Sequence, residues 1–319
     1  MIRFSVIIPV KPGGDVKALQ MLREIDYPLD SWELLIAEGG NPSRQRNRAA
    51  AQASGDVLYF LDDDSLVQPF FLRRAALRYE DPAVAVVGGP SLTPDTDTFL
   101  QHAFGMVLVS RFGGGGVRNR YRCHGTVRAT GEHELILCNL GFRRELFLEF
   151  GGFDERLYPN EENELMDRIA ASGRVLIHDP ELAVTRSQRS SVRAFVRQLH
   201  GYGRGRAEQT IIGGKIKYIA FVPPLFVLYL LALPFRYSPI MLIPLLLYLA
   251  LALLFSLREG VRNRRYLPAM LLPILFCLFH CAFGAGVIRG FLLYPFRSSN
   301  GGRCEVTIRR VKCFGEQPV

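Results

Sequence analysis

The amino-acid sequence predicts an α/β domain followed by a C-terminal helical transmembrane region. Up to about residue 206, short apolar segments alternate with segments of helical periodicity, and charged residues are interspersed throughout. Long apolar runs follow, each close to the roughly 20 residues that a helix needs to cross a bilayer. These runs occupy residues 218–235, 239–257 and 267–294.

These observations divide the chain into three predicted parts. Residues 1–210 form the α/β domain, residues 211–296 form a transmembrane region of about three helical segments, and residues 297–319 form a basic tail. The side of the membrane on which the tail lies stays open. A single span at 267–294 places the tail outside, whereas a bend at the glycines of this run keeps it inside.

The first part begins with an alternation of strands and helices. The run Phe4–Val10 is apolar on both faces, as in a central parallel strand. Asp15 and Asn41-Pro42-Ser43 are suited to begin helices, and Gly55 ends the second one. The further strands are predicted at 32–37, 57–61 and 84–89, with a helix from Pro69. The alternation predicts a parallel sheet with helices on both faces.

The pattern is weaker between residues 94 and 134. There Phe99–Val109 is compatible with a helix, and Phe112–Gly116 reads as a flexible glycine loop. Helical periodicity returns at Glu161–Ala171. Ser190–Glu208 is a basic amphipathic helix, of a kind that commonly lies along a membrane surface.

Charge and cysteine content indicate a cytoplasmic domain attached to a membrane. The net charge is +9, and the basic residues cluster before the first apolar run and at 258–265. This distribution fits cytoplasmic flanks and anionic lipid better than nucleic acid. The first residues run straight into a strand without a signal peptide. We therefore expect reduced cysteines and a multi-pass protein of the inner (plasma) membrane, with its catalytic domain in the cytoplasm.

The segment Gly55–Ser65 carries the clearest functional signal. A short apolar strand ends in Asp62, Asp63 and Asp64, and ligands of α/β sheets bind beyond the carboxyl ends of the strands. Three adjacent carboxylates repel one another unless a cation lies among them. Hard oxygen ligands suit Mg²⁺ or Mn²⁺. Taken alone, the triplet is equally compatible with a solvated acidic turn.

Five motifs in order resemble those of family 2 glycosyltransferases. They are Ser5–Val10, Arg46–Ala50, Gly55–Asp64, Gly151–Glu155 and Asn160–Leu165. This resemblance implies the GT-A fold, a Rossmann-like nucleotide-diphospho-sugar transferase domain. The segments 111–118 and 197–206, together with the apolar region, are most similar to bacterial succinoglycan-type exopolysaccharide glucosyltransferases, which extend a polyprenyl-diphosphate-linked saccharide.

The resemblance also implies a role for individual residues. Glu162 stands at the position of the family's general base, which is usually Asp, and Asp64 and Asp62 stand at the metal position. The residues implied in nucleotide-sugar binding are Pro9, Lys11, Glu38, Arg46, Asp62 and Asp63. Those implied on the acceptor side are Asn139, Glu161, Gln198, Tyr202 and Arg204.

The implied reaction is an inverting transfer of a single sugar. Glu162 removes the proton of an acceptor hydroxyl, which displaces the nucleotide in one step. Gln198–Tyr202 departs from the Gln-x-x-Arg-Trp pattern of processive synthases, which favours single-sugar addition. The implied partners are a nucleotide-diphospho-sugar, with a UDP-sugar favoured, a lipid-linked acceptor, the membrane and a polysaccharide assembly complex.

Two other functions fit the sequence. A polyprenyl-phosphate glycosyltransferase, which makes a lipid-phosphate sugar donor, differs only in its acceptor. A non-catalytic nucleotide-sugar-binding scaffold subunit is compatible with Glu38 and Glu162, where the family usually has Asp. A zinc site at Cys123, His124, His133 and Cys138 is disfavoured, because the spacing matches no common pattern.

Overall fold

The computed structural model describes residues 1–235, 238–296 and 305–317. The chain forms two compact units. The first comprises Met1–Pro94, Asn119–Arg186 and the described part of Ser299–Val319, and the second comprises Asp95–Arg118 and the described part of Ser187–Ser298. The predicted boundary at residue 210 falls inside helix α7 of the second unit.

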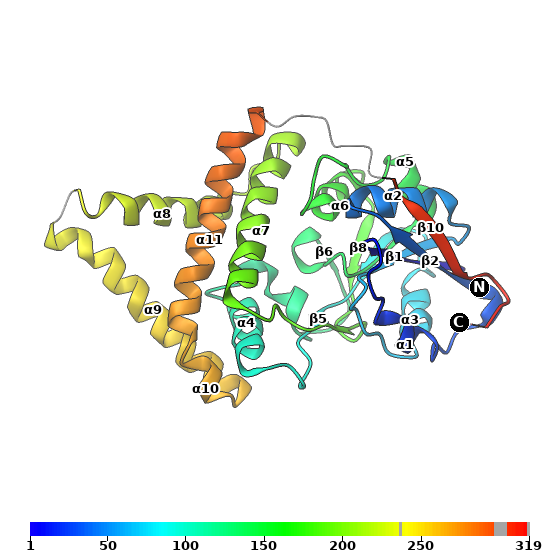
Figure 1. Ribbon diagram of the computed structural model, residues 1–319, viewed down its shortest axis with the longest axis horizontal. Coiled ribbons are helices and arrows are strands. Elements are labelled where there is room, and N and C mark those ends of the chain that lie inside the picture. Colours follow the sequence, from blue (N-terminus) through cyan, green and yellow to red (C-terminus); the bar gives the residue numbers. More distant parts are fainter. Residues whose placement is uncertain (236–237, 297–304, 318–319) are drawn as a thin grey trace. The chain divides into compact units, whose positions relative to one another are not determined.

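The first unit is built on an eight-stranded sheet of order β10-β2-β1-β3-β7-β4-β8-β6 (Figure 1). The strands are β1 (Phe4–Val10), β2 (Trp32–Glu38), β3 (Val57–Leu61), β4 (Val84–Gly88), β6 (Arg128–Thr130), β7 (Asn139–Arg143), β8 (Val175–His178) and β10 (Thr307–Lys312), with β5 (Ser91–Leu92) and β9 (Val184–Thr185) in a second small sheet. The helices are α1 (Ala18–Leu22), α2 (Pro42–Gln52), α3 (Phe71–Arg78), α5 (Arg144–Glu149) and α6 (Glu161–Ala171).

The expectation of a purely parallel sheet is wrong. β1 pairs in parallel with β2 and β3, as predicted, but β7 lies between β3 and β4 and runs antiparallel to both. Gly141 in β7 allows this insertion, because a Cβ atom there would lie 2.7 Å from the Tyr79 hydroxyl. The short and partly polar β7 lacks the apolar alternation by which strands are recognised in a sequence.

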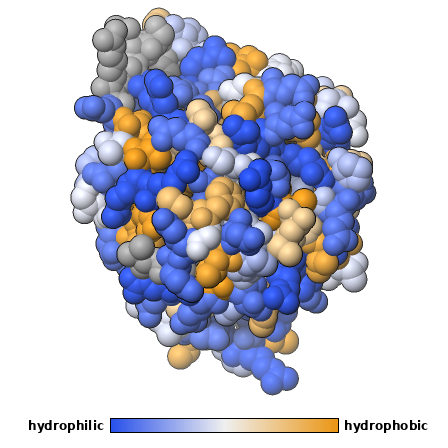
Figure 2. All heavy atoms as spheres, turned by 90° about the vertical axis from the view of Figure 1, so that its right-hand side faces the viewer, coloured by the Kyte–Doolittle hydropathy of each residue, from blue (hydrophilic) through white to orange (hydrophobic). Residues whose placement is uncertain are grey.

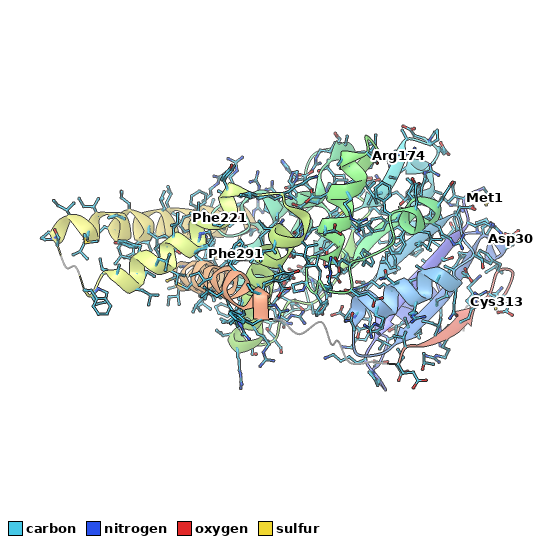
Figure 3. All side chains as sticks on the ribbon, turned by 90° about the horizontal axis from the view of Figure 1, so that it is seen from above. Met1, Asp30, Arg174, Phe221, Phe291 and Cys313 are labelled. Atoms are coloured by element: carbon cyan, nitrogen blue, oxygen red, sulfur yellow. The ribbon has the colours of Figure 1, made fainter. Side chains whose placement is uncertain are left out.

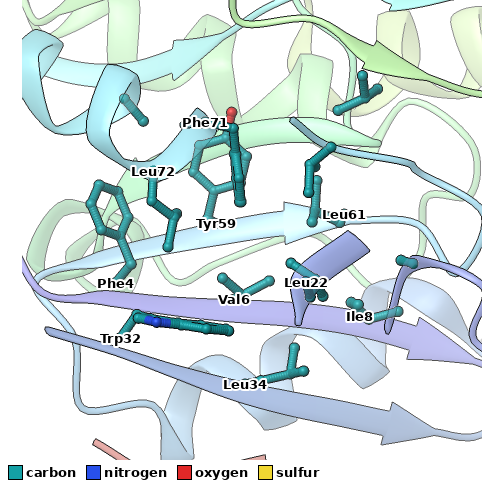
Figure 4. Close-up of a cluster of buried hydrophobic side chains, with 14 of the residues drawn as sticks. Phe4, Val6, Ile8, Leu22, Trp32, Leu34, Tyr59, Leu61, Phe71 and Leu72 are labelled. Carbon is teal, nitrogen blue, oxygen red and sulfur yellow. The ribbon is translucent and has the colours of Figure 1, made fainter. Parts of the chain in front are cut away.

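The core has two layers, one on each face of the sheet. One face buries Phe4, Val6 and Tyr59 with α1 and α3 (Figure 4), and the other buries Ile7 and Phe60 with α2, α5 and α6. Successive residues of β1 thus point to opposite layers, which explains why the whole strand is apolar. The surface shown in Figure 2 is mostly hydrophilic, with scattered apolar residues.

The second unit is helical throughout its regular elements. It contains α4 (Phe99–Val109), α7 (Val192–Gly213), α8 (Val222–Ala232), α9 (Pro239–Asn263), α10 (Tyr266–Ala269) and α11 (Leu272–Leu293). α7 and α11 lie side by side (Figure 1). The single-turn helix Tyr218–Phe221 precedes α8, and its Phe221 ring stacks on Phe291 of α11 at 5.7 Å (Figure 3).

Two expectations for this unit need correction. The apolar stripe of α7 is not left for a membrane surface, because Phe195 and Leu199 are fully buried and Phe195 stacks on Phe104 at 4.2 Å. The glycine-rich segment 112–116 is not an open flexible loop. Phe112 packs among Phe255, Phe276 and His280, and the segment turns into a 3-10 helix at Gly115.

The described residues contain two helices that are long and apolar enough to cross a membrane, in Pro239–Asn263 and Leu272–Phe296. The first of the three predicted segments corresponds to α8, which is shorter. Residues 297–304 of the predicted basic tail lie outside the described residues. Beyond them, β10 adds an antiparallel strand to β2, which the sequence did not lead us to expect.

Candidate active site

The carboxyl ends of β2, β1 and β3 lie together at one end of the sheet, because the three strands are parallel. Val10 is paired with Glu38, and Asp62 follows the last residue of β3. Glu38 accepts a hydrogen bond from the backbone N–H of Gly13 at 3.0 Å. The predicted neighbours Pro9 and Lys11 lie at the same end, Pro9 partly buried and Lys11 exposed.

Gln45 of α2 joins the ends of two of these strands. Its Nε2 donates to the carbonyl oxygen of Val10 at 2.7 Å and to that of Ala37 at 2.5 Å. Nothing in the sequence singled Gln45 out, because its role depends on an end of the sheet that is formed by other segments. This contact holds the start of α2 at the carboxyl ends of β1 and β2, so that Arg46 points toward β3.

Arg186 holds the first and third carboxylates of the acidic triplet together. Its Nη1 lies 3.2 Å from Asp62 Oδ2, and its Nε donates to Asp64 Oδ1 at 2.5 Å. Backbone hydrogen bonds of 2.9 and 2.8 Å between Leu66 and Thr185 bring Arg186 to this place. Arg186 is not among the predicted residues, because it is 122 residues from Asp64 and belongs to no recognised motif.

Arg46 links the acidic triplet to helix α6. Its side chain is buried and donates from Nη2 to Asp62 Oδ1 at 2.8 Å and from Nη1 to Glu161 Oε1 at 3.2 Å. A buried guanidinium requires such carboxylate partners, because an unpaired charge in the interior is costly. The structure thus brings the predicted residues Arg46, Asp62 and Glu161 together in one network.

Helix α6 begins with two buried carboxylates, Glu161 and Glu162. Burial, with the neighbouring charge of Glu162, raises the pKa of Glu161 to about 8 despite Arg46. Burial also raises the pKa of Glu162, and the positive charge of Arg120 opposes this increase. Arg120 Nη1 lies 4.0 Å from Glu162 Oε1. The two carboxylates therefore have different cationic partners, Arg46 for Glu161 and Arg120 for Glu162.

Arg120 is itself held firmly by its surroundings. Its Nη2 donates to the carbonyl oxygen of Glu132 at 2.6 Å, to Glu132 Oε2 at 3.0 Å and to Asn163 Oδ1 at 2.5 Å. Arg120 is not among the predicted residues, because it lies in the segment of weak periodicity. An arginine outside any helical or strand pattern is too common in sequences to indicate a functional site.

The loop before α6 is fixed by the first half of α2. Asn47 accepts from the backbone N–H of Phe153 at 2.9 Å and donates to the carbonyl oxygen of the same residue at 2.8 Å. Arg44 pairs with Glu155 at 2.8 Å, and Ser43 donates to the carbonyl oxygen of Leu157 at 2.9 Å. The motif at 46–50 therefore contacts both the motif at 151–155 and the motif at 160–165.

The donor set at the triplet fits a hard divalent cation. Asp62 and Asp64 already converge on one cationic group, the Arg186 guanidinium. Burial, together with the charges of Asp64 and Asp62, raises the pKa of Asp63. No group of three or more His, Cys, Asp or Glu side chains suited to a metal occurs in the part of the chain that the structure describes. Mg²⁺ is commonly held by one or two carboxylates together with substrate phosphates, and Asp62 and Asp64 offer that number.

The remaining predicted residues have polar partners of their own. Asn139 is fully buried in the core, where it accepts from the Tyr59 hydroxyl at 2.7 Å and donates to the carbonyl oxygen of Leu182 at 2.6 Å. Its polar atoms are thus used within the fold. Gln198, Tyr202 and Arg204 lie on α7 of the second unit. There Gln198 donates to the Tyr202 hydroxyl at 2.7 Å, and Arg204 pairs with Glu208 at 3.5 Å.

The chain is similar to several known proteins. A family model described as glycosyl transferase family group 2 matches residues 57–288. The succinoglycan biosynthesis protein ExoA of Rhizobium meliloti is 25% identical over 64% of this chain and 68% of its own length. A glucosyl-dolichyl phosphate glucuronosyltransferase of Haloferax volcanii is 28% identical, over 35% of this chain and 34% of its own.

A solved structure shares the fold. The mannosyltransferase PcManGT from Pyrobaculum calidifontis, in complex with GDP-Man and Mn²⁺, aligns with a TM-score of 0.54 and 17% identity. The alignment covers 91% of this chain and 87% of that one. The expected GT-A fold is confirmed by this likeness and by the family match.

Proposed function

The chain belongs to the glycosyl transferase family group 2, and from this premise we propose that it is a membrane-bound inverting enzyme. It moves one sugar from a nucleotide-diphospho-sugar to a lipid-linked saccharide. The chain is a glycosyltransferase by its family and fold. The proposal concerns the donor, the acceptor, the stereochemistry and the residues that act.

The observation that carries the proposal is the Arg46 bridge. One buried guanidinium contacts Asp62, at the end of β3, and Glu161, at the start of α6. The carboxylates assigned to the donor and those assigned to the acceptor therefore belong to one polar network. A displacement in a single step requires both reactants at one place, within reach of the same side chains.

The donor half rests on Asp62 and Asp64. These carboxylates would hold Mg²⁺ or Mn²⁺, which when bound neutralises the charge of a leaving diphosphate. The Mn²⁺ and GDP-Man of the Pyrobaculum mannosyltransferase support this proposal. Arg46 and Arg186 add guanidinium donors, which match phosphate oxygens well. Pro9, Lys11 and Glu38 lie at the same end of the sheet and are assigned to the nucleoside.

The acceptor half rests on the different environments of Glu161 and Glu162. Glu161, with a pKa of about 8, is mostly protonated near neutral pH and is a poor base. Glu162 faces Arg120, whose charge favours the ionised carboxylate. The two carboxylates have different cationic partners, and carboxylates in different environments commonly have separate roles. We assign to Glu162 the removal of the proton from the acceptor hydroxyl.

A lipid-linked acceptor is supported by the relatives and by the second unit. The names of two relatives refer to succinoglycan biosynthesis and to glucosyl-dolichyl phosphate. The helices α8 and α9 expose many large apolar side chains, among them Leu225, Leu246 and Leu254. Membrane attachment of this kind would keep the enzyme at the surface where a lipid-linked saccharide is found.

The test is donor turnover by the full-length protein in nanodiscs. UDP- and GDP-sugars are offered with Mn²⁺ or Mg²⁺, with and without a bacterial lipid extract. We expect release of one nucleotide that requires metal and increases with the extract. Asp64→Ala and Glu162→Gln should each lower turnover by at least about 10²-fold, whereas Glu149→Gln, an exposed carboxylate of the same unit, should not.

Two results would contradict the proposal. Full activity of a correctly folded Glu162→Gln variant would exclude Glu162 as the base. Turnover that depends on free polyprenyl phosphate, rather than on a lipid-linked saccharide, would replace the acceptor by a lipid phosphate.

A further inference from the structure

The strand β10, which follows the apolar helices in the chain, pairs with β2, which precedes them. Its residues pair with β2 from Thr307 opposite Glu38 to Lys312 opposite Leu34, and Lys312 Nζ donates to the carbonyl oxygen of Trp32 at 2.6 Å. A strand cannot pair with a sheet through a bilayer. The segment between β9 and β10 must therefore cross a membrane an even number of times, or not at all.

The two long apolar helices differ in how far they are covered by protein. Only 11% of the apolar stretch in α9 is buried within the protein, against 33% of that in α11. The covered residues of α11 include Ala282, Gly284, Gly286 and Val287 in its middle. Length and composition alone do not distinguish a membrane span from a helix that packs on protein.

One partner of α11, the helix α7, cannot enter hydrocarbon. Another partner is the start of α8, since a Cβ atom on Gly284 would lie 2.5 Å from the carbonyl oxygen of Pro223. α7 carries Arg193, Arg197, Arg204, Arg206 and Glu208, and each arginine at the centre of a membrane costs about 2.5–3.5 kcal/mol on insertion scales. The two helices are in backbone contact, since a Cβ atom on Gly286 would lie 2.1 Å from the carbonyl oxygen of His200. α11 can cross the bilayer only if it leaves α7 or takes these charges with it.

The exposed apolar surface lies instead on α8 and α9. These helices contact each other, because the Tyr229 hydroxyl donates to the carbonyl oxygen of Met241 at 2.5 Å and Phe226 stacks on Tyr248 at 4.4 Å. The large apolar side chains of these helices that are more than half exposed are Val222, Leu225, Leu228, Leu231, Ile240, Ile243, Leu246, Leu247, Leu253, Leu254, Leu257 and Val261. With its 25 residues, α9 extends about 37 Å, whereas α8, with 11 residues, extends about 16 Å. A hairpin of the two can therefore enter a hydrocarbon core of about 30 Å without crossing it.

From these contacts we propose that α8 and α9 form a hairpin that enters the bilayer from the side of the sheet and returns to it. α11 stays on α7, outside the hydrocarbon. The basic residues at the end of α9, Arg258, Arg262, Arg264 and Arg265, then lie on the side of the sheet, as the positive-inside rule favours for a cytoplasmic domain. This proposal rests on the membrane attachment proposed above and specifies which surface meets the lipid.

The test determines which face of the membrane three positions reach. Single cysteines are added to the full-length chain as Gln20→Cys before β2, Asn263→Cys at the last residue of α9 and Gln317→Cys after β10, all at exposed positions. Each variant is labelled with a membrane-impermeant maleimide in sealed right-side-out and inside-out vesicles. Labelling of the parent chain, which has its own cysteines, is subtracted.

We expect the three added cysteines to react from the same face and to be protected from the other. Reaction of Gln317→Cys from the face opposite to Gln20→Cys would mean an odd number of crossings and would overturn the proposal. Reaction of Asn263→Cys alone from the opposite face would mean that α9 and α11 cross as a pair, and would overturn it as well.

Two further measurements distinguish this proposal from the proposed function. Recovery of the chain in the soluble fraction would exclude the lipid surface on α8 and α9. Donor turnover is measured on the same vesicles. Labelling from one face without turnover would contradict the proposed function while supporting the hairpin, whereas turnover with labelling from opposite faces would do the reverse.

Discussion

Two consecutive glutamates at the start of α6 have different partners, and this difference separates their chemistry. Arg46 contacts Glu161 at 3.2 Å, whereas Arg120 approaches Glu162 to 4.0 Å. Arg46 also binds Asp62 at 2.8 Å, so its charge is shared between two carboxylates. Removal of Arg46 would leave the buried Glu161 without its guanidinium partner, whereas Asp62 would keep Arg186, so Arg46 contributes to folding as well as to the site.

The pH dependence of turnover should report the charge of Arg120. A general base must be ionised, and a nearby positive charge lowers the pKa of a carboxyl group. In Arg120→Gln the pKa of Glu162 should therefore rise further, and the acidic limb of the kcat/KM profile should move to higher pH by about one to three units. Arg120→Lys keeps the charge and should shift the limb less.

A different outcome would limit Arg120 to a structural role. If Arg120→Gln lowers kcat/KM by the same factor at every pH, the residue only supports the backbone at Glu132 and the side chain of Asn163. The profile of the free enzyme is the correct readout, because kcat/KM reports the pKa values of the free enzyme.

The site residues that could be predicted are those next to recognisable elements. Asp62 and Asp64 follow an apolar strand, and Glu162 begins a periodic helix. Arg120 and Arg186 could not be predicted, because each reaches its carboxylates from a distant segment that shows no periodicity. Asn139 is buried, and its hydrogen bonds to the Tyr59 hydroxyl and to the Leu182 carbonyl oxygen could not be predicted either, because both partners come from other segments.

At the scale of elements, α2 positions the loop that leads into α6. Asn47 bonds both backbone groups of Phe153, and Gly152 lies against it, since a Cβ atom there would be 2.7 Å from Asn47 Oδ1. Arg168 of α6 reaches back to the carbonyl oxygen of Gly152 at 3.2 Å. The start of α6 is therefore set by contacts made by α2 and by α6 itself.

The variant Asn47→Ala tests this coupling. Loss of the two backbone contacts should lower the free energy of unfolding by about 1–3 kcal/mol. It should also lower kcat/KM by about 10–100-fold, because the carboxylates of α6 lose their alignment. Urea unfolding and turnover are measured beside Gln52→Ala, which alters the exposed end of the same helix. Unchanged turnover in a destabilised Asn47→Ala would show that α6 is placed without α2.

Elements with a clear apolar pattern were predicted well, and strands with polar residues were not. The helix at 161–171 and the strand at 57–61 form where the sequence indicates, and a helix also forms at 99–109, where the pattern is weak. β7 and β10 carry polar or charged residues, and their existence depends on neighbouring strands that are made by other segments. The sheet is therefore mixed where its sequence indicated a parallel one.

At the scale of the whole molecule, a buried lysine fastens the last strand to the sheet. Lys312 Nζ donates to carbonyl oxygens of Leu29, Trp32 and Cys313 at 2.8, 2.6 and 3.0 Å. It also lies 4.4 Å from the centre of the Trp32 ring. A polar group with this many partners is costly to remove, because the carbonyl groups stay buried without a donor.

The variant Lys312→Met should lower the free energy of unfolding by about 2–3 kcal/mol. Trp32 is the only tryptophan in the sequence, so its fluorescence follows unfolding directly beneath the lysine. Arg309→Met, at an exposed position of the same strand, serves as the matched control and should change stability little. Equal stability of both variants would show that the pairing of β10 with β2 does not depend on the buried ammonium group.

The late position of β10 in the chain has a consequence for biosynthesis. β2 has left the ribosome long before its neighbour exists, since 268 residues separate Glu38 from Thr307. At translation rates of about 5–20 residues per second, this delay is roughly 13–55 s. During that interval the apolar helices are synthesised while the edge of β2 stays without its partner. A nascent chain at this stage is a candidate client for a chaperone that shields strand edges, and a truncated chain would keep that exposed edge permanently.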